Sequence, residues 1–152
     1  MPLVAGDRWY NTSNGTEWFW NGTYWLSTQL YSGSIYAGHL SATATVLPLD
    51  GTTEYTNIFI VSHILFGAPA NAPQDSDNYW KFDLYATSTG TAIASVINSN
   101  IIPGVTGNFA YTVSLNNFVQ NIGLFSSTIS KIGNPGNLRP TVQIVTYRLV
   151  YL

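Results

Sequence analysis

The side chains best suited to chemistry in this sequence are a few scattered acids. Asp75 and Asp77 share a Pro-rich loop, Asp83 lies in a predicted strand, and Asp7 and Glu17 lie near the amino end. Two carboxylates held roughly 5–10 Å apart can hydrolyse a glycosidic bond, and two acids in a loop can also ligate calcium. Neither pattern is specific. A solvated loop is the better interpretation, and we expect no metal site.

The two histidines offer little more. His39 lies in a connector rich in Gly and Ser, and His63 lies in a long apolar strand. We interpret the first as a connector residue and the second as a packed or interface residue. The sequence has no Gly-rich phosphate loop, no zinc-binding histidine pair and no Gly-x-Ser-x-Gly elbow. We therefore expect no enzymatic activity, no catalytic residue and no cofactor.

Aromatic side chains are concentrated near the amino end, between Arg8 and Ser27. This stretch holds four of the five tryptophans and two Asn-Gly dipeptides. Asn-Gly favours a type I′ turn between antiparallel strands, because both of its residues tolerate positive φ. We predict a small meander of three strands over Arg8–Asn11, Thr16–Trp20 and residues 23–27.

Two-residue loops at both turns would pair Trp18 with Trp25 and Trp9 with Trp20. Because side chains alternate along a strand, all four of these tryptophans would share one face. The other face would carry the remaining aromatic side chains of the meander, Tyr10, Phe19 and Tyr24.

A small sheet with aromatic side chains on both faces needs partners beyond itself. Each such side chain buries about 150–250 Å², at about 25 cal/mol per Å² of apolar area, which is more than three short strands can cover. The tryptophan face could be core, a contact with a subunit or another protein, or a sugar-binding platform. One face can be core while the other is contact. The expected contact residues are Trp9, Tyr10, Trp18, Phe19, Trp20, Tyr24 and Trp25.

The sequence of 152 residues is long enough for one domain with a real core, but it carries few charges. Charged residues make up 8% of it, and the net charge is −2. Such a surface repels copies of itself weakly, which favours assembly. The lysines and arginines are scattered, so we expect no nucleic-acid partner. Without a cysteine, a signal-peptide pattern or a long apolar segment, we expect synthesis in a cytoplasm and no membrane partner.

The remainder of the chain alternates short strands with Gly, Pro and Asn turns. The predicted strands are residues 41–47, 54–66, 79–86, 91–97, 108–115, 124–132 and 141–152, and the predicted connectors are residues 28–40, 67–78 and 101–107. No stretch shows helical periodicity. The pattern favours an all-β protein, with a β-sandwich or jelly roll over residues 31–152 and the aromatic meander over residues 1–30. The order of the strands cannot be read from one sequence.

The aromatic stretch resembles a short module of virion proteins from tailed bacteriophages. It reads GDRWYNT at residues 6–12 and WNGTYW at residues 20–25, and it is most similar to versions in phages of cyanobacteria. The turn KIGNPG at residues 131–136 is similar to turns in carboxy-terminal β-sandwich domains of such proteins. The resemblance implies an all-β, usually homotrimeric virion protein and transfers no catalytic residues.

In tail fibres this module usually follows a long trunk, whereas here it begins close to Met1. If the chain is the whole gene product, a compact capsid decoration (cement) protein on the particle surface is the first hypothesis. Its partners would be other copies of itself, in a homotrimer, and the major capsid protein or another virion component. If the chain is a fragment, the tip of a tail fibre that binds host glycans becomes the leading hypothesis. A glycan-cleaving domain is the third.

Overall fold

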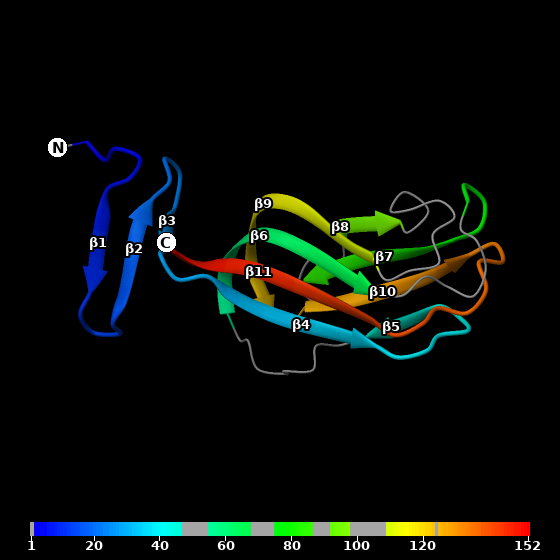
Figure 1. Ribbon diagram of the computed structural model, residues 1–152. Helices are drawn as coiled ribbons and strands as arrows, with labels where there is room; N and C mark the ends of the chain where they lie inside the picture. Colours follow the sequence, from blue (N-terminus) through cyan, green and yellow to red (C-terminus); the bar gives the residue numbers. More distant parts are fainter. Residues whose placement is uncertain (1, 47–54, 68–74, 87–91, 98–108, 124) are drawn as a thin grey trace.

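The computed structural model describes residues 2–46, 55–67, 75–86, 92–97, 109–123 and 125–152. The regular elements in this part of the chain are all β-strands (Figure 1). They are β1 (Arg8–Asn11), β2 (Thr16–Trp20), β3 (Trp25–Ser27), β4 (Tyr31–Ala37), β5 (Ala44–Val46), β6 (Tyr55–Gly67), β7 (Tyr79–Ala86), β8 (Ala92–Ile97), β9 (Phe109–Gly123), β10 (Phe125–Ile132) and β11 (Thr141–Tyr151). No helix long and apolar enough to cross a membrane occurs among the described residues.

The strands from β4 to β11 form two antiparallel sheets. In the first sheet β4 pairs with β11, β11 with β6, and β6 with β9, while the second has the order β5-β10-β7-β8. The pairs β4–β11, β5–β10, β6–β9 and β7–β8 are therefore nested within one another along the chain. One long hairpin folded over into two layers produces this nesting, which defines a jelly roll. The all-β prediction is confirmed, and the topology supplies the strand order that the sequence could not.

Side chains from both sheets fill the space between the two layers, in two apolar clusters. Along β6 and β10 a polar residue separates the members of one cluster from those of the other. On β6 this residue is His63, and on β10 it is Ser127, and both are fully buried. Gln143 on β11 is buried beside them and hydrogen-bonds to both. These three residues form a polar layer across the middle of the core.

The aromatic meander continues the first sheet beyond one end of the jelly roll (Figure 1). The end of β11 pairs with β3, at Val150 with Leu26 and at Tyr151 with Trp25. The predicted meander strands are all present, although the third begins at Trp25 rather than at residue 23. Because β11 pairs with β4 and β6 as well, one strand belongs to both the meander and the body.

The predicted pairing within the meander is wrong at both turns. Trp9 pairs with Trp18, and Trp20 pairs with Trp25, so each register differs from the prediction by two residues. Each connection has four residues, 12–15 and 21–24, rather than two. A shift of two leaves every side chain on its original face. The predicted grouping of the four tryptophans on one face is therefore retained.

Asparagine side chains explain the longer turns. The Asn11 side-chain oxygen accepts a hydrogen bond from Ser13 N at 2.9 Å. The Asn21 oxygen accepts bonds from Thr23 N at 2.9 Å and from Tyr24 N at 2.7 Å. In such Asx turns the asparagine side chain satisfies backbone amides within the loop. The loop is therefore two residues longer than a two-residue turn, and strand pairing begins only outside it. The Asn-Gly signal correctly predicts the hairpins but not their loop lengths.

Two predictions about the body were also wrong. Residues 28–40, predicted as a connector, contain β4, whose Ile35 and Ala37 are buried. The break predicted between residues 115 and 124 does not occur, because β9 continues through Asn116 at φ 50° and a bulge opposite β6 absorbs the irregularity. The connector at residues 101–107 and part of the one at residues 67–78 lie outside the described residues.

Gly133 is the residue that allows the turn after β10 to lie against the segment before β7. Its φ is +63°, and a Cβ there would overlap the Asp77 carbonyl oxygen and lie 2.7 Å from Asn78 Oδ1. That Oδ1 accepts a hydrogen bond from Asn134 N at 2.8 Å. We expect Gly133→Ala to lower the free energy of unfolding by about 2–4 kcal/mol, from backbone strain and forced displacement.

Urea unfolding measures this change, and Gly38→Ala is the matched control because a Cβ at Gly38 meets nothing within 4 Å. The control is expected to change the stability by less than about 1 kcal/mol. Equal stabilities of the two variants would contradict the role given to Gly133.

Candidate functional site

Four tryptophans of the meander and one tyrosine of β11 lie together on one face of the sheet, and we call this group the aromatic surface. Its members are Trp9, Trp18, Trp20, Trp25 and Tyr151. Ring centroids are 5.0 Å apart for Trp9 and Tyr151, 5.6 Å for Trp18 and Tyr151, and 5.7 Å for Trp20 and Trp25. Trp9 stacks on Trp18 at 6.5 Å. These separations fall in the range of favourable aromatic pairs.

Strand pairing builds the aromatic surface. Trp9 lies directly opposite Trp18, Trp20 opposite Trp25, and Trp25 opposite Tyr151. Such cross-strand pairs are the unit of sheet stabilisation. Tyr151 was not among the contact residues expected from the sequence. The alternation along β11 could have given its face, but nothing in the sequence placed that strand next to the meander.

Burial divides the aromatic surface into an anchor and an open part. Trp18 is 4% exposed, whereas Trp9 is 38% and Tyr151 is 48% exposed. Tyr10 is also exposed, but on the opposite face of β1. The group therefore combines a packed centre with uncovered ring surface, which contact with another molecule would bury.

Two of the expected contact residues, Phe19 and Tyr24, are half-buried and make contacts within the chain. Tyr24 stacks on Phe118 of β9, with ring centroids 4.7 Å apart, and lies 6.4 Å from Phe59 of β6. Phe19 carries the Arg148 guanidinium over its ring, 5.2 Å from the centroid. The face opposite the tryptophans thus contacts the jelly-roll body at these two positions.

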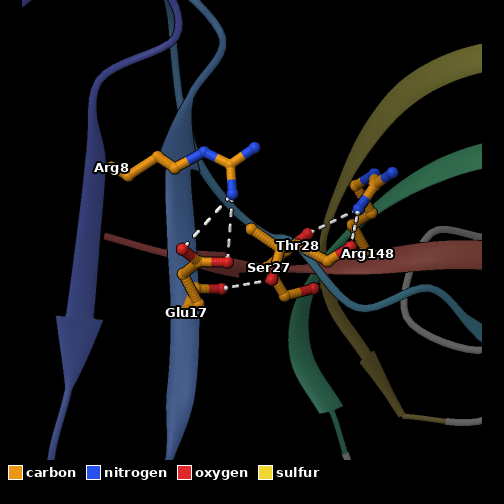
Figure 2. Close-up of polar contacts among 5 residues, drawn as sticks. All are labelled: Arg8, Glu17, Ser27, Thr28 and Arg148. Atoms are coloured by element: carbon orange, nitrogen blue, oxygen red, sulfur yellow. Dashed lines mark hydrogen bonds and ion pairs between the residues drawn. The ribbon is translucent and has the colours of Figure 1, made fainter.

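Arg148 of β11 also holds the backbone at the point where the chain leaves the meander (Figure 2). Its Nη1 donates hydrogen bonds to the carbonyl oxygens of Ser27 at 2.7 Å and of Thr28 at 2.5 Å. Leu149 N donates to Ser27 Oγ at 3.0 Å. Burial lowers the pKa of Arg148, yet an arginine stays charged in a protein. We call these contacts between β11 and residues 27–28 the joint.

Two charged side chains of the meander form an ion pair on the face opposite the aromatic surface. Arg8 Nη1 lies 3.3 Å from a carboxylate oxygen of Glu17, and both side chains are largely solvated (Figure 2). The Asp7 carboxylate accepts a hydrogen bond from Val4 N at 2.9 Å. These two acids, considered as catalytic candidates, have structural partners. The open rings therefore lie on the face of the meander that carries neither Arg8 nor Glu17.

The other acidic candidates are engaged in local structure. Asp75 Oδ1 accepts hydrogen bonds from Asp77 N at 2.9 Å and Asn78 N at 2.8 Å. The bond from Asp77, followed by those from the Asn78 side chain and amide, lowers the pKa of Asp75. Asp83 pairs with Lys81 Nζ at 2.9 Å, and that hydrogen bond raises the pKa of Lys81. No group of three or more possible metal ligands occurs among the described residues.

The two histidines occupy different environments, as their sequence neighbours suggested. His39 is exposed, whereas His63 is fully buried in the polar layer, with Nε2 3.0 Å from Gln143 Oε1. Gln143 Oε1 also accepts a hydrogen bond from Ser127 Oγ at 3.1 Å. Burial lowers the pKa of His63, and the bond to Gln143 opposes that shift. His63 is a packed residue of the core.

No family model matches the sequence, and no curated protein matches it. Several solved structures are similar in fold at low identity. A chain of the cyanophage Pam1 capsid asymmetric unit is 10% identical over 80% of this chain and 84% of that one, with a TM-score of 0.42. The tobacco streak virus coat protein is 8% identical over 82% and 90%, with a TM-score of 0.40. FLHE is 14% identical over 79% and 96%, with a TM-score of 0.37. Likenesses with TM-scores below 0.5 identify neither a family nor a function.

Proposed function

We propose that this chain is a non-enzymatic structural protein of a bacteriophage particle, carried on the capsid as a decoration (cement) protein. The observation that carries the proposal is the half-exposed part of the aromatic surface, Trp9 on the edge strand β1 and Tyr151 at the end of β11 that pairs with the meander. Trp and Tyr are enriched in buried protein contacts, where rigid rings supply area at low entropic cost. A decoration protein stabilises a shell by adding such contacts.

The composition and the fold support the same proposal. A surface with few charges and a net charge of −2 suits a protein partner and gives no attraction to nucleic acid. The jelly roll is an architecture of viral capsid proteins, although lectin domains also use it. The resemblance of residues 6–25 to a phage virion module favours the virion. The proposed partners are copies of the chain itself, in a homotrimer, and the major capsid protein or another virion component.

Removing an exposed ring tests this function. We expect Trp9→Ala to fold normally and to bind phage shells lacking this protein about 30-fold more weakly or worse, the loss typical of an interface hot spot of ~2 kcal/mol. Co-sedimentation with purified shells measures the affinity. Tyr36→Ala, which removes an exposed ring from β4, is the control and is expected to bind normally. Normal binding of Trp9→Ala, or no binding of the unmodified protein, would contradict the proposal.

The second candidate function is recognition of host surface glycans at the tip of a tail fibre. It is favoured by the same open rings, because sugars stack on exposed indole and phenol faces. A glycan array with the unmodified protein and Trp9→Ala separates the two functions. Mass spectrometry of purified particles does so independently, since a shell protein is present in many copies per particle and a tail protein in few.

A further inference from the structure

We propose that Arg148 is a positioning residue that fixes the angle of the aromatic surface to the jelly-roll body. The inference deepens the proposed function and rests on it, because it concerns how the same surface is presented to a partner. The joint would then contribute to binding of the partner by the aromatic surface, rather than to the stability of the jelly-roll body.

The ladder that connects the meander to β11 is short. Only two residue pairs link β3 with β11, at Val150 and Tyr151. Isolated two-stranded ladders are marginally stable, and so short a connection would allow the meander to rock on the body. Additional contacts between the meander and the jelly-roll body must therefore fix the angle between them.

Arg148 supplies contacts to three segments at once. Its guanidinium donates to the carbonyls of Ser27, at the end of β3, and Thr28, in the link to β4, and lies over Phe19 of β2. Its own backbone lies opposite Phe59 of β6, inside the jelly-roll sheet. Figure 2 shows the side chain reaching from the red ribbon of β11 to the two carbonyl groups.

The chemistry of the joint favours arginine over other cations. A planar guanidinium can donate to more than one acceptor while its face rests on an aromatic ring, whereas an ammonium is a compact, strongly hydrated point charge. Thr28 extends the joint into the meander, because its amide donates to the Glu17 carbonyl oxygen at 2.8 Å and its Oγ1 to the same oxygen at 3.2 Å. The hydrogen bonds thus continue from β11 through Thr28 to β2.

A fixed surface binds more tightly than a mobile one because less ordering is needed on association. Loosening the joint should therefore weaken binding even though every ring of the aromatic surface remains present. A residue that served only the stability of the body would not show this separation between affinity and folding.

The experiment compares Arg148→Met, Arg148→Lys and Arg8→Met by amide hydrogen exchange and by binding to shells that lack the protein. In Arg148→Met we expect exchange in β2 and β3 to be about tenfold faster, exchange in β6 and β10 to be unchanged, and binding to be about tenfold weaker. Arg148→Lys should fall between Arg148→Met and the unmodified protein. Arg8→Met removes only a solvated ion pair and is expected to change neither measurement.

Unchanged exchange in β2 and β3 would overturn the proposal, and so would an equal loss of protection in the body. If Arg148→Met does not fold, Arg148→Lys decides by the same two measurements. Failure of the unmodified protein to bind shells would refute the proposed function. The exchange measurement would still decide whether Arg148 holds the joint, so the two failures can be told apart.

Discussion

Trp18→Ala is expected to lower the free energy of unfolding by about 3–5 kcal/mol, the usual cost of removing a buried aromatic side chain. Trp18 is 4% exposed and packs between Trp9 and Tyr151, with centroids at 6.5 Å and 5.6 Å. Its removal would leave a cavity at the centre of the meander, which has no second layer of its own to collapse into the space. Urea unfolding followed by circular dichroism measures the change.

Trp9→Ala is the matched control, because the two tryptophans lie directly opposite each other on neighbouring strands and differ in exposure. We expect Trp9→Ala to cost about 1–2 kcal/mol, less than Trp18→Ala, because part of the Trp9 ring is already exposed and the aromatic pairs that it loses are each worth about 0.5–1.5 kcal/mol. Equal losses in the two variants would mean that the meander has no anchor distinct from its open part. We expect unequal losses: Trp18→Ala should mainly lower the free energy of unfolding, whereas Trp9→Ala should mainly weaken binding to shells.

This contrast shows where prediction from the sequence ends. The period of two along each strand correctly predicts that the four tryptophans share one face. The prediction holds although both registers are wrong by two residues, because a shift of two keeps every side chain on its face. Period alone gives the face of a side chain but not its exposure. The exposure of Trp18 depends on Tyr151, whose ring lies against it. Tyr151 reaches the aromatic surface only because the carboxy-terminal strand β11 pairs with β3.

The strand β4 and the role of Arg148 could not be predicted from the sequence for the same physical reason, because both depend on partners that are distant in the chain. In β4 the run Ser32-Gly33-Ser34 carries no hydrophobic alternation, so the strand is stabilised by pairing with β11 rather than by local preference. Likewise, Arg148 shows no distinguishing signal in the sequence. Its partners are backbone carbonyls more than 100 positions away, and backbone acceptors carry no residue identity.

Acidification is expected to destabilise the jelly roll through His63. Burial lowers the pKa of His63 in the folded protein, and Gln143 and Ser127, its neighbours in the polar layer, are uncharged. The unfolded chain therefore binds a proton below pH ~6.5 while the folded protein resists it. The contribution is fully present above pH ~6.5 and is lost as the pH falls toward the folded pKa, with a slope of up to about 1.4 kcal/mol per pH unit.

Urea unfolding at a series of pH values between about 7.5 and 5 measures this slope, and the two histidines of the chain provide the comparison. His63→Gln keeps a side chain that can hydrogen-bond to Gln143 but cannot titrate, so the stability of this variant should fall less steeply on acidification. His39→Gln, at an exposed position, is expected to keep the original slope. If His39→Gln flattened the slope and His63→Gln did not, the acid response would arise outside the polar layer. The role of the polar layer would then be limited to fixing how the two sheets pack. Its hydrogen bonds can do this because they form only when β6, β10 and β11 are correctly aligned.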